Sequence, residues 1–282
     1  MFHLFTSDIC TLFTLFDGQI RLVGGCVRDS LLNHPFSDID LCTPLPPQQG
    51  KTLLEKAGIR VLDNAIAYGT LTAVFPEHTY QITTLRQDID PKGRATDVQF
   101  IDSYKQDAFR RDFTINALSV DEHQVIYDYT GGFSDLETRT IRFIGDPEKR
   151  IQEDFLRILR FFRFWALYGK TEPDPKALKA CARYKDGLIP LSQERKKAEF
   201  FKLLGAPKVL ETLELMDKTR VLDVLIPGAK LSLLKKALTK NPDLPVVLRG
   251  ALLTQDPLPF PLTREEKKLL KTCTPSSPVS AP

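Results

Sequence analysis

The fold is decided by residues 22–41, which read LVGGCVRDSLLNHPFSDIDL. The apolar residues 20–23 predict a short strand that runs into a glycine pair, and residues 27–32 predict a helix. Residues 39–41 predict a second strand. A strand, a glycine turn, a helix and another strand in close succession indicate a mixed α/β domain.

Two aspartates, Asp38 and Asp40, alternate with apolar residues at the period of a strand. Because successive strand side chains point to opposite faces, both carboxylates project to one side, about 7 Å apart along the backbone. Carboxylates together with substrate phosphates are the ligands that Mg²⁺ prefers. Two metal ions about 4 Å apart activate an attacking hydroxyl and neutralise a leaving pyrophosphate. The same pattern is common on solvated strands, so the pair alone leaves both interpretations open.

The glycine turn ahead of this pair is a candidate phosphate site. Glycines let a backbone approach a phosphate closely, and a helix N-terminus presents unpaired N–H groups. Arg28, one turn into the predicted helix, is placed to clamp a triphosphate with two hydrogen bonds. The spacing matches neither the dinucleotide fingerprint nor the P-loop. A purely structural turn stays an alternative, but the aspartate pair about ten residues later favours the phosphate interpretation.

The segments around this motif complete a mixed domain that reaches about residue 132. Polar residues 86–99, which include Pro91 and Gly93, are expected to form a mobile loop. One further helix is expected between residue 99 and about residue 132. The remaining predicted elements are helices at 2–16 and 49–57 and strands at 69–75, 79–85, 118–120 and 125–127.

The pattern changes to helices from residue 145 onward. No strand signal competes there, and the C-terminal stretch 274–282 is rich in Pro and Ser, which predicts disorder. The helices are predicted at residues 151–168, 175–182, 192–204 and 208–217.

The first of these helices contains the sequence EDFLRILRFFR at residues 153–163. Asp154 and Arg157 are neighbours at i, i+3, and together they present an acceptor beside a fork of donors. That arrangement complements a base edge with an amino donor next to ring acceptors, as in cytosine and adenine but not uracil and guanine. Arg160 and Arg163 continue the cationic row and would face phosphates. Ion pairs within one helix are the plainer alternative.

A third charged motif, Arg110-Arg111-Asp112, precedes an apolar run. Two adjacent arginines commonly form a solvated charge run. The chemical alternative is contact with phosphate or ribose, in which Asp112 is either a third acidic group or an orienter of Arg111.

The net charge of +3 hides an uneven distribution. Residues 1–149 carry 14 basic and 21 acidic side chains, whereas residues 150–282 carry 25 basic and 15 acidic ones. This division indicates a bound cation in the first half and a polyanion in the second. Charge alone leaves chance asymmetry between two solvated surfaces as an alternative.

Cysteine, histidine and hydropathy patterns exclude several classes of protein. Five cysteines without a CxxC pair argue against a disulfide framework and a structural zinc site. Four histidines without HExxH spacing argue against a metallohydrolase. No apolar run approaches the length of a membrane helix, and the N-terminus lacks the basic start of a secretory signal. We therefore expect a soluble, cytoplasmic protein that does not act at a membrane.

Taken together, the motifs resemble the class II tRNA nucleotidyltransferases (the CCA-adding enzymes) and the bacterial poly(A) polymerases. They follow the family's order and spacing over about residues 20–205. The matching segments are 22–29, 38–40 with Thr43, 65–70, 82–86, 110–118, 128–136, 153–163 and 192–195.

The resemblance implies an α+β nucleotidyltransferase head, with a polymerase-β-like mixed sheet and helices, followed by an all-α neck and body. It implies a head at residues 1–140, a neck at 141–205, a body at 206–273 and a disordered tail at 274–282. Family members usually run well past this length, so the implied body is abridged, and its grip on the tRNA elbow is left open.

The resemblance also implies roles for the charged residues of the head. Asp38 and Asp40 would be the catalytic, metal-binding carboxylates, with Mg²⁺ as cofactor in a two-metal mechanism. Gly25, Arg28 and Arg111 would hold the phosphates and sugar of the incoming nucleotide.

In the neck, the resemblance implies that Asp154 and Arg157 select the base without a nucleic-acid template. Arg160 and Arg163 would complete the nucleotide pocket. The implied partners are tRNA, CTP and ATP, and no stable protein partner is implied.

The 65–70 motif and the polar loop 86–99 resemble CCA-adding enzymes more than poly(A) polymerases, and CC-adding relatives have a shorter loop. Tyr68 stands where the family often has His, and no role carries over to it. The expected activity is addition of CCA to the 3′ end of tRNA from CTP and ATP, with release of pyrophosphate. Poly(A) synthesis, CC-only or A-only addition, and a non-catalytic RNA-binding protein are the alternatives.

Overall fold

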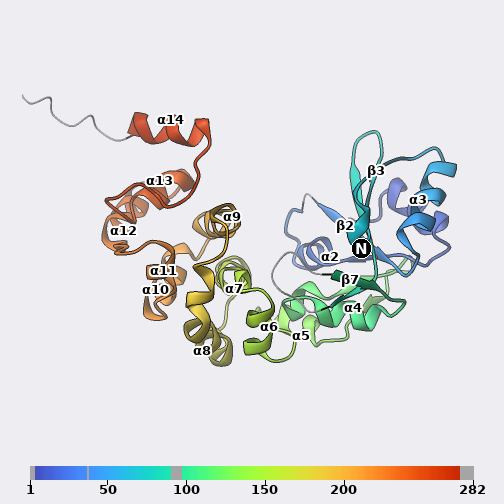
Figure 1. Cartoon of the computed structure of the whole chain (residues 1–282), viewed down its shortest axis with the longest axis horizontal. Coiled ribbons are helices and arrows are strands. Elements are labelled where there is room, and N and C mark those ends of the chain that lie inside the picture. The colour runs from blue at the N-terminus through green and yellow to red at the C-terminus, as the bar shows by residue number, and fades with distance from the viewer. Residues whose placement is uncertain (1–3, 37, 90–96, 274–282) are drawn as a thin grey trace, which may run out of the picture. The chain divides into compact units, whose positions relative to one another are not determined.

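The computed structural model describes residues 4–36, 38–89 and 97–273, and the chain divides into two units, Met1–Arg150 and Ile151–Pro282 (Figure 1). The predicted boundaries at residues 140 and 205 divide the chain more finely and stay predictions. The predicted disordered tail at 274–282 lies outside the described residues.

A seven-stranded mixed sheet forms the first unit, in the order β3-β4-β5-β2-β1-β8-β9. Strands β2 and β5 run parallel, and the other neighbours in the sheet run antiparallel. The strands are β1 Arg21–Val23, β2 Ile39–Thr43, β3 Arg60–Ala65, β4 Thr70–Val74, β5 Thr79–Thr84, β8 Ser119–Val120 and β9 Ile126–Tyr127. The helices are α1 Ser7–Leu15, α2 Gly25–Leu31, α3 Pro47–Lys56, α4 Tyr104–Arg110 and α5 Gly132–Glu137, with short 3-10 turns η1 Ile66–Tyr68 and η2 Thr114–Asn116.

One face of this sheet forms the apolar core. A row of paired residues crosses five strands, and each of them is at most 2% exposed: Leu71, Ile82, Leu41, Leu22 and Val120. Helix α3 packs over β3 and β4 on the edge of the sheet. Because strand side chains alternate, the neighbouring residues of β2 must point to the opposite face.

The opposite face bears Asp40 and Cys42 of β2. A second, smaller apolar cluster forms there from Val23, Cys42 and Leu85, with Tyr104 of α4 packed against it. Burial raises the pKa of the Cys42 thiol to about 12, so this side chain acts as a small apolar group. Asp40 therefore lies at the border between a packed cluster and solvent.

The expectation of a mobile loop at residues 86–99 is wrong for the residues that the structure describes there. Strands β6 (Arg86–Ile89) and β7 (Asp97–Phe100) form an antiparallel ribbon. The side-chain amide of Gln87 also donates to Gln99 across the ribbon, at 3.1 Å. Polarity misled the prediction, because the backbone pairing that forms the ribbon needs no apolar run. Phe100, at the end of the ribbon, lies close to Gly69. Residues 90–96 lie outside the described residues.

Helices are the only regular secondary structure among the described residues of the second unit. This confirms the predicted fold class of a mixed head followed by an all-α region. Helix α7 packs against α9 and α10, and α9 packs against α13. None of the described helices is long and apolar enough to cross a membrane. After α6 (Pro147–Glu153), the helices are α7 Leu156–Tyr168, α8 Pro175–Tyr184, α9 Gln193–Leu204, α10 Val209–Lys218, α11 Val221–Leu225, α12 Leu231–Lys240, α13 Val246–Ala251 and α14 Arg264–Cys273, with a 3-10 turn η3 at Lys185–Leu188.

The prediction of one continuous helix at residues 151–168 is wrong, because the helical backbone is interrupted at residues 154 and 155, between α6 and α7. The side chain of Asp154 accepts the N–H of Leu156 at 3.1 Å, and its carbonyl accepts the N–H of Arg157 at 3.0 Å. A short acidic side chain that bonds to the backbone just ahead of it ends one helix and starts the next. Asp154 therefore lies in the interruption between α6 and α7 rather than inside a helix.

Candidate active site

Two acidic side chains lie together at the start of β2. Asp38 is exposed just before the strand, and Asp40 is half-buried within it. Burial raises the pKa of Asp40 and the charge of Asp38 raises it further, while Arg111 opposes both effects. A cation bound between the two carboxylates would remove the repulsion by which Asp38 raises the pKa of Asp40.

The donor set fits a hard divalent cation such as Mg²⁺, which keeps several waters and takes only one or two carboxylates from a protein. In the part of the chain that the structure describes, no group of three or more His, Cys, Asp or Glu side chains gathers to hold a metal ion. Asp38 and Asp40 would therefore be the chain's own ligands. A cavity of about 450 Å³ adjoins Asp38 and is also lined by Gln81 and His78.

The glycine turn between β1 and α2 approaches this carboxylate pair. Gly24 has φ +79° and ψ −127°, a conformation that favours glycine. A Cβ on Gly24 would come within 3.4 Å of the Nη1 of Arg111, so the guanidinium lies directly over the turn. The predicted site residues Gly25, Asp40 and Arg111 are thus brought to one region of the first unit.

Arg28 has a different environment from the one that its sequence position suggested. Its side chain is 8% exposed and forms a two-bond ion pair with Asp29, at 3.0 and 2.7 Å. Arg28 also donates to the side chain of Asn116, which in turn donates to Asp112 at 3.0 Å. These contacts fasten α2 to the segment that follows Arg111. A direct phosphate contact of Arg28 stays a prediction.

Arg111 lies between two acidic groups. Its Nη2 donates to Asp107 at 2.9 Å, and the charge of Asp40 also stabilises its protonated form. The Nε of Arg111 is buried and has no hydrogen-bond partner among the described residues. Arg150 donates to the backbone carbonyls of Arg110 and Arg111 and thereby stabilises the backbone at the end of α4.

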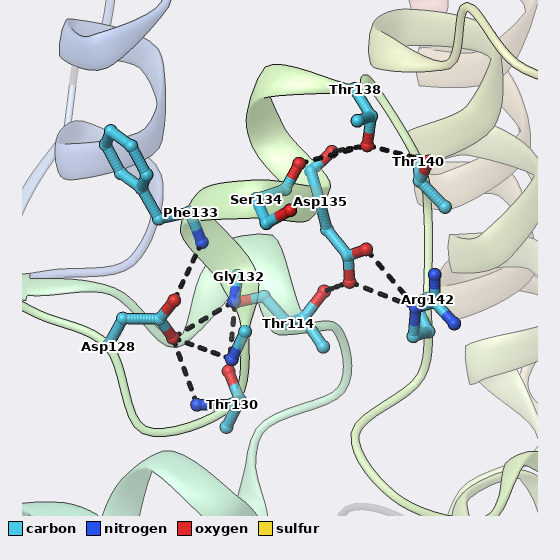
Figure 2. A network of polar contacts seen from close by, with 11 residues as sticks. Thr114, Asp128, Thr130, Gly132, Phe133, Ser134, Asp135, Thr138, Thr140 and Arg142 are labelled. Carbon is cyan, nitrogen blue, oxygen red and sulfur yellow. Dashed lines mark hydrogen bonds and ion pairs between the residues drawn. The ribbon is translucent and has the colours of Figure 1, made fainter.

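A polar network supports the segment after Arg111 (Figure 2). The carboxylate of Asp128 accepts four backbone N–H groups at the start of α5, from residues 130–133, at 2.9–3.0 Å. Asp135 of α5 accepts the hydroxyl of Thr114 at 2.7 Å and the Nε of Arg142 at 3.2 Å. A Cβ on Gly132 would lie only 2.1 Å from the carbonyl of Thr114, so only glycine permits this close approach of α5 to η2.

Replacing Asp135 with alanine is expected to lower the free energy of unfolding by about 1–3 kcal/mol, because the buried hydroxyl of Thr114 loses its acceptor. Thermal unfolding of the purified chain, followed by fluorescence, measures this loss. Ser134→Ala, at an exposed neighbouring position on α5, is the matched control. Equal melting temperatures for the two variants would contradict the importance of the network.

In the second unit, the side chains of the two predicted base-selecting residues form ion pairs with other residues. Asp154 forms an ion pair with Arg195 of α9 at 2.7 Å. Arg157 forms an ion pair with Glu153, the last residue of α6. The side chain of Arg157 is 12% exposed, so both residues are held in defined orientations.

Glu199 of α9 forms ion pairs with Arg160 and Arg163, the other two predicted site arginines of α7. The Nε of Arg163 lies 2.6 Å from its carboxylate, and the Nη1 of Arg160 lies 3.5 Å from it. Arg163 also stacks over the ring of Phe164, at 4.4 Å from the centroid. Buried Glu199 thus fixes the cationic row of α7 against α9.

Sequence reasoning missed the partners that hold these residues: Asp107, Arg195 and Glu199. The contacts of Asp107 could have been predicted, because it precedes Arg110 by three residues and Arg111 by four, the spacing of ion pairs along a helix. Arg195 and Glu199 lie about 40 residues from the side chains they contact, and no local pattern connects them.

Comparison with known proteins matches two segments of the chain to two family models. Residues 20–142 match the poly A polymerase head domain. Residues 172–233 match a domain described as "Probable RNA and SrmB- binding site of polymerase A".

Three relatives illustrate the similarity. The human mitochondrial CCA tRNA nucleotidyltransferase 1 is 36% identical over 94% of this chain and 65% of its own length. The crystal structure of the Bacillus stearothermophilus CCA-adding enzyme in complex with CTP matches with a TM-score of 0.68 and 30% identity, over 77% of this chain and 53% of that one. A tRNA nucleotidyltransferase complexed with a primer tRNA and an incoming ATP analog matches with a TM-score of 0.70 and 25% identity, over 93% of this chain and 83% of that one.

The chain spans 65% of the human relative and about half the length of other curated relatives. The head-domain match includes the aspartate pair, the glycine turn and Arg111, and the fold agrees with that of the solved relatives. Residues 20–142 therefore form a poly A polymerase head domain, and the chain as a whole resembles the class II tRNA nucleotidyltransferases and bacterial poly(A) polymerases.

Proposed function

We propose that this chain adds CCA to the 3′ end of tRNA, using CTP and ATP and releasing pyrophosphate. The observation that carries the proposal is the pair Asp38 and Asp40 beside Arg111 and the glycine turn, on a head that matches the family model. The relatives support this product, because they are named as CCA-adding enzymes and tRNA nucleotidyltransferases and their solved complexes hold CTP, primer tRNA and an ATP analog.

In this proposal Asp38 and Asp40 hold Mg²⁺, with two ions bound when substrate is present. The metal ions supply charge stabilisation to the attacking and leaving oxygens. Arg111 binds the phosphates and sugar of the incoming nucleotide at the Gly24–Gly25 turn. Arg28, which is locked to Asp29 and Asn116, stabilises the helix behind that turn and completes the nucleotide site.

Base selection is assigned to Asp154 and Arg157. Each is fixed by an ion pair, to Arg195 and Glu153 respectively, and fixed donors and acceptors are what discrimination between base edges requires. Arg160 and Arg163 complete the pocket from the next turns of α7. Their shared partner Glu199 orients them without neutralising both charges.

The remaining helices are assigned to tRNA binding. Residues 1–140 would be the head, 141–205 the neck and 206–273 an abridged body. The excess of basic side chains after residue 150 supports a track for tRNA phosphates. We propose a cytoplasmic location, although the human relative is a mitochondrial protein. Poly(A) synthesis is the second candidate, because the head-domain model carries that description.

Nucleotide transfer is tested by incubating the full chain with a tRNA that lacks its last three nucleotides and with labelled CTP. We expect the tRNA to become labelled in the presence of Mg²⁺ and to stay unlabelled after chelation with EDTA. Restoring Mg²⁺ should restore labelling, which separates metal removal from irreversible damage. Labelling that persists at full strength in EDTA would contradict the metal assignment.

A further inference from the structure

The carboxylate of Asp107 is the centre of a cluster of charged residues in the first unit. The residue is 2% exposed and lies in α4. Its Oδ1 accepts the Nε of Arg110 at 2.8 Å and the backbone N–H of Arg86 at 3.3 Å, and its Oδ2 accepts the Nη2 of Arg111 at 2.9 Å. One buried carboxylate thus receives three donors from two separate segments of the chain.

Asp107 is ionised in this environment. Burial alone would raise its pKa, but Arg111 and Arg110 outweigh that effect and hold the pKa below its usual range. A buried carboxylate is tolerated only when donors of this kind surround it. The guanidinium of Arg111 is in turn held on one side by a fixed negative charge.

The other side of Arg111 is turned toward the proposed nucleotide site. Its Nη1 lies over Gly24, and Asp40 acts on it electrostatically. Its buried Nε has no hydrogen-bond partner among the described residues. A guanidinium presents five donors in a rigid fork, so fixing one amino group on Asp107 fixes the direction of the rest.

We propose that Asp107 is a positioning residue for nucleotide binding: it holds the Arg111 guanidinium over the glycine turn, where it meets the phosphates of CTP and ATP. The same carboxylate accepts the backbone N–H of Arg86, the first residue of β6. Asp107 therefore binds both the β6–β7 ribbon and the segment of Arg110 and Arg111. The inference rests on the proposed function and adds to it a residue that touches neither nucleotide nor metal.

Asp107→Asn tests the proposal, because asparagine keeps the size of the side chain and an acceptor for Arg86 but loses the charge. The expected result is a rise of about 10- to 100-fold in KM for both CTP and ATP, the effect of losing one charge-assisted hydrogen bond. The KM for tRNA is expected to stay within about twofold of the wild-type value. A general structural defect would instead lower kcat and change both KM values together.

Two further variants separate positioning from stability. Arg110→Gln removes the other ion pair of Asp107 and is expected to lower the melting temperature while leaving the nucleotide KM near the wild-type value. Adding Asp107→Asn to Arg111→Gln is expected to cause no further rise in nucleotide KM, since Asp107 acts through Arg111. Independent, multiplying effects of the two substitutions would overturn the proposal, as would a wild-type nucleotide KM in Asp107→Asn.

The dissociation constant for CTP, measured by calorimetry on the full chain, gives a readout that needs no catalysis. A chain that binds CTP but extends no tRNA would contradict the proposed function, while weaker CTP binding by Asp107→Asn would still support the positioning role. If Asp107→Asn does not fold, Asp107→Glu takes its place, because it keeps the charge but moves Arg111 away. The same weakening of CTP binding is expected, and unchanged binding would overturn the inference.

Discussion

Replacing Asp40 with alanine is expected to abolish nucleotide incorporation while leaving tRNA binding intact. The substitution removes one of two carboxylates from the start of β2, where burial and Asp38 already raise the pKa of Asp40. The rate is expected to fall by at least about 1,000-fold, because the metal site supplies several kcal/mol of charge stabilisation and about 1.4 kcal/mol is a factor of ten.

The measurement is single-turnover incorporation of labelled CTP, with tRNA affinity measured separately by filter binding. Glu55→Ala, an exposed acid on α3, is the control for a loss of one negative charge from the first unit. Asp40→Asn keeps the shape of the side chain and should be nearly as inactive as Asp40→Ala. Incorporation at the wild-type rate in either Asp40 variant would remove the basis for the metal assignment.

Arg157→Ala is expected to relax discrimination against UTP and GTP. A pair of directed hydrogen bonds to a base edge is worth about 1–3 kcal/mol of discrimination, so selectivity for CTP over UTP should fall by about 10- to 100-fold. The ratio of kcat/KM for the two nucleotides, measured on the same tRNA, gives this quantity. Total incorporation of CTP is expected to fall less than its selectivity.

Glu153→Gln is the matched control for Arg157→Ala. It removes the charge of Glu153 but keeps an amide oxygen that accepts from the guanidinium of Arg157, so this side chain, which is 12% exposed, stays fixed. We expect this variant to select bases nearly as the wild type does. If Glu153→Gln loses selectivity while Arg157→Ala keeps it, the role assigned to Arg157 is wrong.

The first strand, the glycine turn and the second strand could be predicted from sequence, because their signals are local. Apolar runs predict β1 and β2, and the glycine pair marks the turn between them. The ribbon at residues 86–100 could not be predicted in this way. Its strands mix polar and apolar residues on each face, and the backbone pairing that defines them has no composition signal. Strand β3 was missed for a related reason, since it lies at an edge of the sheet and buries no residue fully.

The site shows the same division between local and distant contacts. The charged residues themselves could be named from spacing and from resemblance to a known family. Their partners could not, because Asp154 contacts Arg195 and Arg163 contacts Glu199, across the interface between α7 and α9. The predicted continuous helix also hid the position of Asp154 in the interruption between α6 and α7, where its carboxylate accepts the N–H of Leu156.

The sequence of the product's 3′ end tests the central claim most directly. The full chain is incubated with a tRNA lacking its last three nucleotides, together with CTP, ATP or both, and the product ends are sequenced. The account predicts CCA when both nucleotides are present and CC when CTP is present alone. A long tract of A, a product that stops at CC in the presence of ATP, or an unextended tRNA would contradict it.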